Sequence, residues 1–258
     1  MAQLADRYVL PAIGERPINA IDTHDVLTIV EPLWQEKTET ATRVLNRMSL
    51  ILDWATARKL RIGDNPARWK GHLDAVLPKR SKAQKVINHS ALPYRRLPQF
   101  MTALRDQSGI GAGAAELMIL TAIRTREVRF AAWSEIDLNG RLWIIPAARM
   151  KAERDHRVPL SEAALAILTA LPREGARVFP GLGQHAILKA LQRVNREITA
   201  HGFRSTLSDW CAEETNFPSE VREMALAHVV GDKVEAAYRR GDPFQKRRAL
   251  AEAWAAFW

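Results

Sequence analysis

One stretch of the chain separates two segments of different character. Residues 77–98 have the sequence LPKRSKAQKVINHSALPYRRLP, which contains three prolines and no apolar residues at helical spacing. Prolines in a polar run without periodicity favour extended, loop-like backbone. The stretch therefore predicts an interdomain linker at 77–97, between a first domain at 1–76 and a second domain at 98–258.

The predicted linker also holds most of the excess positive charge. Residues 1–76 carry ten basic and ten acidic side chains, and 99–258 carry 22 and 19. Between them lie six basic side chains and no acid: Lys79, Arg80, Lys82, Lys85, Arg95 and Arg96. A solvated, flexible connector accounts for this composition. The functional alternative is a strap that crosses phosphates and releases their counterions.

The composition of the whole chain narrows the classes of partner. The 258 residues are 47% hydrophobic, which suffices for a core, and the net charge of +9 favours a polyanionic partner such as nucleic acid. No apolar run approaches the roughly 18 residues of a membrane span, and the amino terminus lacks the hydrophobic core of a signal peptide. We therefore expect a soluble, cytoplasmic protein.

Cysteine and histidine usage argues against a metal site. Cys211 is the single cysteine, so an internal disulfide and a multi-cysteine zinc finger are excluded. The other potential ligands are not spaced as in metal sites. Cys211 lies on an apolar helical stretch and is expected to be a core thiol.

Helical periodicity dominates both domains. In the first domain, 22–25 supply N-cap residues ahead of one helix, and Thr38 opens a second that runs to Ala55, so a small helical bundle is expected. In the second domain, helices are expected at 97–106, 112–123, 126–132, 162–171, 184–199, 204–215, 219–227, 232–240 and 244–257. Apolar segments at 142–145 and 158–160 flank the polar run 149–157, which predicts a β-hairpin with Lys151 near its turn. The expected fold class is mainly α with a small β-hairpin sheet.

Three clusters bring basic or nucleophilic side chains to helix ends. Arg124 and Glu127 are three residues apart and would share a helical face, which alone favours a surface salt bridge. His201 and Arg204 flank Gly202, where a capping or packing histidine is the ordinary explanation. His228 is followed ten residues later by Tyr238, which alone indicates an amphipathic surface aromatic.

In this order the clusters are far more specific than any one of them. The arrangement R-x-x-E, hairpin lysine, H-x-x-R, second histidine and tyrosine resembles that of the tyrosine recombinase, or phage integrase, family. Longer segments resemble its prophage and genomic-island branch: VRFAAWSEIDL, MKAERDHRVPLS, HGFRSTLSDWCAEETNF and EMALAHVVGDKVEAAYRRGDPFQKRRALAEAWAAF. Upstream, YVLPAIGERPINAI, ETATRVLNRMSLILDWA and NPA resemble its helical, SAM-like core-binding domain, so the resemblance covers nearly the whole chain.

The resemblance implies DNA cleavage and rejoining through a 3′-phosphotyrosine, without metal, nucleotide or other cofactor. Tyr238 would be the nucleophile, because Tyr8 and Tyr94 lie outside the clusters. The remaining catalytic groups would be Arg124, Lys151, His201, Arg204 and His228, with Glu127 in support. Two guanidiniums would bind the phosphate oxygens, the histidines would donate to those oxygens or exchange protons, and Lys151 would protonate the leaving oxygen.

The sequence departs from the family pattern in two respects. Ala122 stands where the family usually has glycine, and Arg126 where a small residue is common. The amino-terminal arm-binding domain of this branch is absent, so a truncated gene, an excised fragment or an arm-independent form is expected.

The implied partner is double-stranded DNA, bound at core attachment sites by a tetramer. The terminal helix 244–257 is expected to dock either on its own domain or on a neighbouring protomer. Two other functions stay open: a non-catalytic DNA-binding remnant, and a monomeric enzyme that relaxes DNA in the manner of a type IB topoisomerase.

Overall fold

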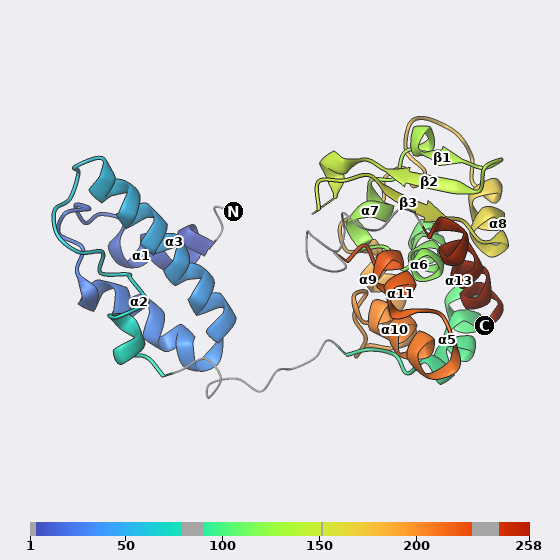
Figure 1. Cartoon of the computed structure of the whole chain (residues 1–258). Helices are drawn as coiled ribbons and strands as arrows, with labels where there is room; N and C mark the ends of the chain where they lie inside the picture. Colours follow the sequence, from blue (N-terminus) through green and yellow to red (C-terminus); the bar gives the residue numbers. More distant parts are fainter. Residues whose placement is uncertain (1–3, 79–89, 151, 229–242) are drawn as a thin grey trace. The chain divides into compact units, whose positions relative to one another are not determined.

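The computed structural model describes residues 4–78, 90–150, 152–228 and 243–258. The chain divides into two compact units, Met1–Asn88 and His89–Trp258 (Figure 1). Both are mainly helical, and a small sheet belongs to the second. Within the described residues, no helix is long and apolar enough to span a membrane.

The first unit is a small bundle around two antiparallel-packed long helices. Its described elements are a π-helical turn η1 (Ala5–Val9), α1 (Leu10–Ile13), α2 (Thr23–Glu36), α3 (Thr38–Ala57) and a 3-10 turn η2 (Leu73–Ala75). The Asp22 carboxylate accepts from Asp25 N at 3.0 Å and Asp25 returns the contact, a capping box that begins α2 where expected. Val26, Val30 and Leu45 are fully or almost fully buried between the helices.

The second unit contains most of the helices. Its described helical elements are η3 (Tyr94–Arg96), α5 (Leu97–Arg105), α6 (Ile110–Thr121), α7 (Thr125–Arg129), η4 (Trp133–Glu135), η5 (Ala147–Arg149), α8 (Glu162–Ala170), α9 (Ala186–Val194), α10 (Gly202–Glu214), α11 (Ser219–Ala225) and α13 (Phe244–Ala256). Most expected helices are confirmed to within two residues. The expected helix 184–199 is shorter, because Asn195 leaves helical geometry and its side chain accepts from Glu197 N at 3.0 Å. The expected helix 232–240 lies outside the described residues.

A three-stranded antiparallel sheet runs along one side of the second unit (Figure 1). Its strands are β1 (Ile136–Asp137), β2 (Leu142–Ile145) and β3 (His156–Pro159), in that order. Trp143 pairs with Ile136 on one side and Val158 on the other. Trp143 and Ile145 are fully buried, whereas Leu142 and Ile144 on the other face are not. The hairpin prediction is confirmed, with a short third strand in addition.

The last residues of the expected linker pack into the second unit. Leu92, Tyr94 and Leu97 belong to its core, and Thr206 Oγ1 donates to Leu92 O at 2.7 Å. At Gly202 a Cβ would lie 2.3 Å from the Ser90 carbonyl oxygen, so this close approach of α10 to the incoming chain requires glycine. The described part of the second unit therefore begins at residue 90, ahead of the boundary expected at 98.

The terminal helix α13 packs on its own unit. Trp254 is 1% exposed and its Nε1 donates to Ile119 O of α6 at 2.9 Å. Leu250 is equally buried, and the Trp254 ring lies 5.0 Å from that of Trp210 in α10. In the structure this helix therefore docks on its own domain, which is one of the two expected alternatives.

Candidate active site

The site is built around a buried arginine in the first turn of α10. Arg204 is 5% exposed. Its Nη1 donates to Ala122 O at 2.5 Å, and its Nη2 donates to Leu226 O and lies 3.0 Å from His228 Nε2. A guanidinium has five N–H donors, so these contacts leave two donors for a ligand. The guanidinium is thereby fixed between the ends of α6 and α11.

Both helix ends that bind Arg204 turn through a left-handed residue. Ala122, which ends α6, has φ +52°, and Ala227, which follows α11, has φ +50°. At α11 the amides of Ala227 and His228 return to the carbonyls of Met224 and Glu223, at 3.1 and 2.9 Å. This is a Schellman cap with alanine in the position that glycine usually occupies. Glycine would adopt the conformation of residue 122 without strain.

Arg124 lies beside Arg204 and adds a second positive charge. Burial, followed by the charge of Arg124, lowers the pKa of Arg204 to about 10, and the charges of Glu127 and Glu223 oppose the shift. Arg124 is half-buried, and no hydrogen bond of its guanidinium is found among the described residues. Among the described residues, no side chain neutralises both guanidiniums, so the pair can bind an anion.

The expected shared helical face of Arg124 and Glu127 is wrong. Arg124 precedes α7 in extended geometry, with φ −82° and ψ 154°, so it is not a helical residue. Within the described chain the two side chains form no ion pair. Glu127 is 5% exposed and its Oε2 has no hydrogen-bond partner among the described residues. Its negative charge raises the pKa of Arg204, against the larger effects of burial and of Arg124.

His228 is held by a residue that the sequence analysis did not single out. Its Nδ1 lies 2.7 Å from Glu223 Oε2, and its Nε2 faces Arg204. The hydrogen bond from His228 lowers the pKa of Glu223. A glutamate three residues before the helix C-cap was the available signal. The sequence did not reveal this contact, because the turn that brings His228 over Glu223 has alanine at the position where glycine would mark a helix end.

The segment between β2 and β3 borders the same site. Met150 and Ala152 line, with His228 and Ala227, an open cleft of about 380 Å³. Lys151 itself lies outside the described residues. Its flanking residues are therefore placed beside His228, although the two segments are far apart in sequence.

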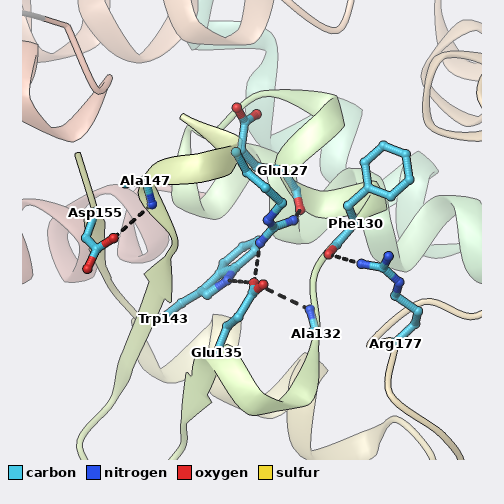
Figure 2. A network of polar contacts seen from close by, with 9 residues as sticks. Glu127, Phe130, Ala132, Glu135, Trp143, Ala147, Asp155 and Arg177 are labelled. Atoms are coloured by element: carbon cyan, nitrogen blue, oxygen red, sulfur yellow. Dashed lines mark hydrogen bonds and ion pairs between the residues drawn. The ribbon is translucent and has the colours of Figure 1, made fainter. Parts of the chain in front are cut away.

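A polar network anchors this segment (Figure 2). Arg149 forms an ion pair with Glu135, whose Oε2 also accepts from Trp143 Nε1 at 3.1 Å. Arg149 Nη1 donates to the backbone carbonyl of Glu127 at 3.4 Å, which ties the segment to α7. Figure 2 shows the Glu127 carboxylate pointing away from this network. At the far end of the segment, Asp155 Oδ1 accepts from Ala147 N at 2.8 Å.

The other predicted residues are placed as follows. His201 is exposed and directly precedes α10, one turn before Arg204. Arg95 and Arg96 lie in η3, where Arg95 contacts Glu214 at 3.7 Å and Tyr94 Oη at 3.1 Å. The predicted residues that lie outside the described ranges are Lys79, Arg80, Lys82, Lys85, Lys151 and Tyr238.

Tyr94 and Cys211 have environments unsuited to nucleophilic chemistry. Tyr94 Oη lies 2.7 Å from Glu214 and 2.8 Å from Glu213, and these hydrogen bonds raise the pKa of Tyr94 to about 12. Cys211 is 3% exposed, and burial raises the pKa of its thiol to about 12. The expected core thiol is confirmed.

The second unit also has two neighbouring basic hollows. One, of about 550 Å³, is lined by Arg126 and Arg129 of α7 and by Gln192 of α9. The next, of about 610 Å³, shares Gln192 and is lined by Lys189, Arg193 and Arg196. Thr125 and Ala200, neighbours of Arg124 and His201 in sequence, line the first hollow. Together the two hollows form a basic surface, and the residues that follow Arg124 and precede His201 lie at its edge. No group of three or more potential metal ligands occurs among the described residues.

We compared the sequence with the patterns of known protein families, and two of these patterns match. The sequence pattern described as "Phage integrase family" matches residues 91–243, and that described as "Phage integrase central domain" matches 1–72. The first match alone covers more than half of the chain. This chain belongs to the phage integrase family.

Its relatives include prophage integrases of Escherichia coli. Prophage integrase IntA is 34% identical over 97% of this chain, and prophage integrase IntZ is 32% identical over 97%. The chain spans 62% of the length of IntA and 63% of that of IntZ.

Solved structures share the fold. A lambda integrase dimer bound to a COC′ core site aligns with a TM-score of 0.67 at 16% identity, over 93% of this chain and 87% of that one. The Tn1549 transposon integrase, in complex with a circular intermediate DNA, aligns at 0.61 and 12% identity, over 95% and 90%. At these identities the likeness shows the mainly α fold with its small sheet.

Proposed function

We propose that the chain is a tyrosine-type site-specific recombinase that integrates or excises a prophage or genomic island. It cleaves double-stranded DNA through a 3′-phosphotyrosine and rejoins the strands. Family membership and the relatedness to prophage integrases support the reaction class. As in the family, the reaction requires neither a metal nor ATP.

The observation that carries the proposal is the buried Arg204 beside Arg124. Burial lowers the pKa of Arg204, as does the nearby second cation. An anion bound between two guanidiniums relieves that repulsion, and a phosphodiester matches their planar donors. In the pentacoordinate transition state the non-bridging oxygens gain charge, so preorganised donors stabilise it more than the ground state.

The other roles follow from the chemistry of the side chains. Tyr238 attacks the phosphate, and its phenol, with an ordinary pKa near 10, needs the adjacent cations and a base. Lys151 gives a proton to the leaving 5′-oxygen. His228 and His201 donate to phosphate oxygens or exchange protons with the reacting groups, and Glu127 supports the arginine pair electrostatically. Because the phosphotyrosine ester conserves the energy of the phosphodiester, rejoining proceeds without ATP.

The basic surface and the linker would hold the DNA on either side of the reacting phosphate. Arg126, Arg129, Lys189, Arg193 and Arg196 line the two basic hollows of the second unit. The linker cations would add phosphate contacts that carry no sequence information. Since one related structure is a lambda integrase tetramer bound to a Holliday junction, we propose that four copies act on paired core sites. The place of action is the DNA in the bacterial cytoplasm.

A suicide substrate tests the proposal. A nicked duplex that carries the attachment site loses a short strand on cleavage, so the covalent intermediate accumulates. We expect the wild-type chain to give a covalent protein–DNA band and Tyr238→Phe to give none. A band with the variant would show that the nucleophile is wrong. Binding without any band in the wild type would favour the non-catalytic remnant, and cleavage with relaxation but no strand exchange would favour the topoisomerase-like enzyme.

A further inference from the structure

His228 contacts groups on both sides of its ring, and the two contacts determine its protonation pattern. Nε2 lies 3.0 Å from Arg204 Nη2, and a guanidinium only donates hydrogen bonds. Nε2 is therefore the acceptor, and the proton of the neutral ring is on Nδ1. That proton meets Glu223 Oε2 at 2.7 Å.

Glu223 holds His228 by its backbone as well as by its side chain. The amide of His228 donates to the carbonyl of Glu223 at 2.9 Å, within the cap that ends α11. The side-chain bond and the backbone bond together fix both the position and the rotation of the imidazole. The His228 side chain is 45% exposed, so without Glu223 its ring would have few packing contacts to orient it.

We propose that Glu223 is a positioning residue of the cleavage reaction. It keeps His228 in the Nδ1–H form, with Nε2 directed at Arg204 and toward the cleft that Met150 and Ala152 border. Nε2 takes up a proton from the attacking nucleophile by giving up its contact with Arg204, and the Glu223 carboxylate then stabilises the imidazolium. The lowered pKa of Glu223 keeps the carboxylate charged at neutral pH. This inference rests on the proposed recombinase function.

The first test reads the ring directly. In ¹⁵N-histidine-labelled full-length protein, the His228 signals are assigned by their loss in His228→Gln. We expect the Nδ1–H pattern in the wild type and in Glu223→Gln, whose amide oxygen still accepts, and a mixture of Nδ1–H and Nε2–H forms in Glu223→Ala, whose ring is free to turn away from Arg204. An Nε2–H pattern in the wild type would overturn the proposal, and this result does not depend on whether the protein cleaves DNA.

The second test separates positioning from folding. With the suicide duplex, Glu223→Ala should cleave about ten-fold or more slowly, the loss expected for one hydrogen bond to a charged group. Its affinity for the uncleaved duplex should stay unchanged, and Glu223→Gln should recover a large part of the rate. Glu220→Gln, which removes a carboxylate from the same helix, is the matched control and should cleave normally. Wild-type cleavage by Glu223→Ala, or a loss shared equally by Glu220→Gln, would contradict the proposal.

Discussion

At the scale of single residues, the site depends on two alanines in a conformation that suits glycine. Ala122 and Ala227 both have positive φ, and each lies next to a carbonyl or side chain that binds Arg204. The left-handed region costs a non-glycine residue about 1–2 kcal/mol. The strain is offset by the bonds that these turns allow Arg204 and His228 to form.

Ala227→Gly should stabilise the second unit. It removes the left-handed strain and adds about 0.5–1 kcal/mol of backbone entropy cost, so the free energy of unfolding should rise by up to about 1 kcal/mol. Urea unfolding measures the change. Ala225→Gly, two residues earlier within α11, is the control and should lower the same quantity by about 1 kcal/mol. Equal destabilisation by both variants would show that Ala227 is not strained.

The two arginines should respond differently to replacement by lysine. Arg204→Lys cannot reach the Ala122 and Leu226 carbonyls together, so it should lose about 2–4 kcal/mol of stability, since each unmet buried acceptor costs about 1–3 kcal/mol. Arg124→Lys should change stability by less than about 0.5 kcal/mol. Both should slow cleavage by roughly 100-fold or more, because each removes a donor for the transition state. If Arg204→Lys and Arg124→Lys lowered the free energy of unfolding equally, the structural role of Arg204 would be contradicted.

At the scale of elements, periodicity predicted the helices well and predicted their ends less well. Val26 and Val30 in α2, and Val44 and Met48 in α3, recur four residues apart and are buried as expected. The end of α9 depends on Asn195, whose turn is a local side-chain effect within an apolar pattern. Strand β1 has two residues, too few for any alternation to be visible. Ala227 carries no sequence signal for its left-handed conformation, so the position of Glu223 under His228 was not predictable.

The cis packing of α13 predicts a stability effect that is independent of protein concentration. Trp254 is 1% exposed and contacts α6 and α10 of its own unit. Trp254→Ala should therefore lower the free energy of unfolding of the second unit by about 3–5 kcal/mol. Denaturation at protein concentrations that differ by 100-fold checks this. A midpoint that rises with concentration would indicate docking between protomers.

At the scale of the whole molecule, the basic side chains gather in two places. Basic side chains of α7 and α9 line two neighbouring hollows in the second unit, whereas Lys79, Arg80, Lys82 and Lys85 belong to the linker that the sequence predicts. The order of motifs in the sequence predicted the family, and two of the residues that it singled out, Arg204 and His228, are in contact. It could not predict that residues 90–97 pack into the second unit, because Leu92, Tyr94 and Leu97 are too few to show a period.

Replacement of the four linker cations by glutamine should weaken DNA binding to a similar degree on all sequences. Each phosphate contact that is lost should reduce the slope of log affinity against log salt by about 0.9. Titrations at several salt concentrations, on attachment-site and random duplexes, measure both effects. An unchanged salt slope would show that the linker does not cross phosphates, and a loss confined to the attachment site would indicate base recognition instead.

The central claim is that a tyrosine carries the DNA beside the Arg124–Arg204 pair. The most direct measurement is the mass of the modified peptide after the covalent intermediate is digested with nuclease and protease. We predict a phosphonucleotide on the peptide that contains Tyr238, and its loss in Arg204→Ala. Modification of Tyr8, Tyr94 or any serine, or the same yield of adduct without the Arg204 guanidinium, would contradict the account.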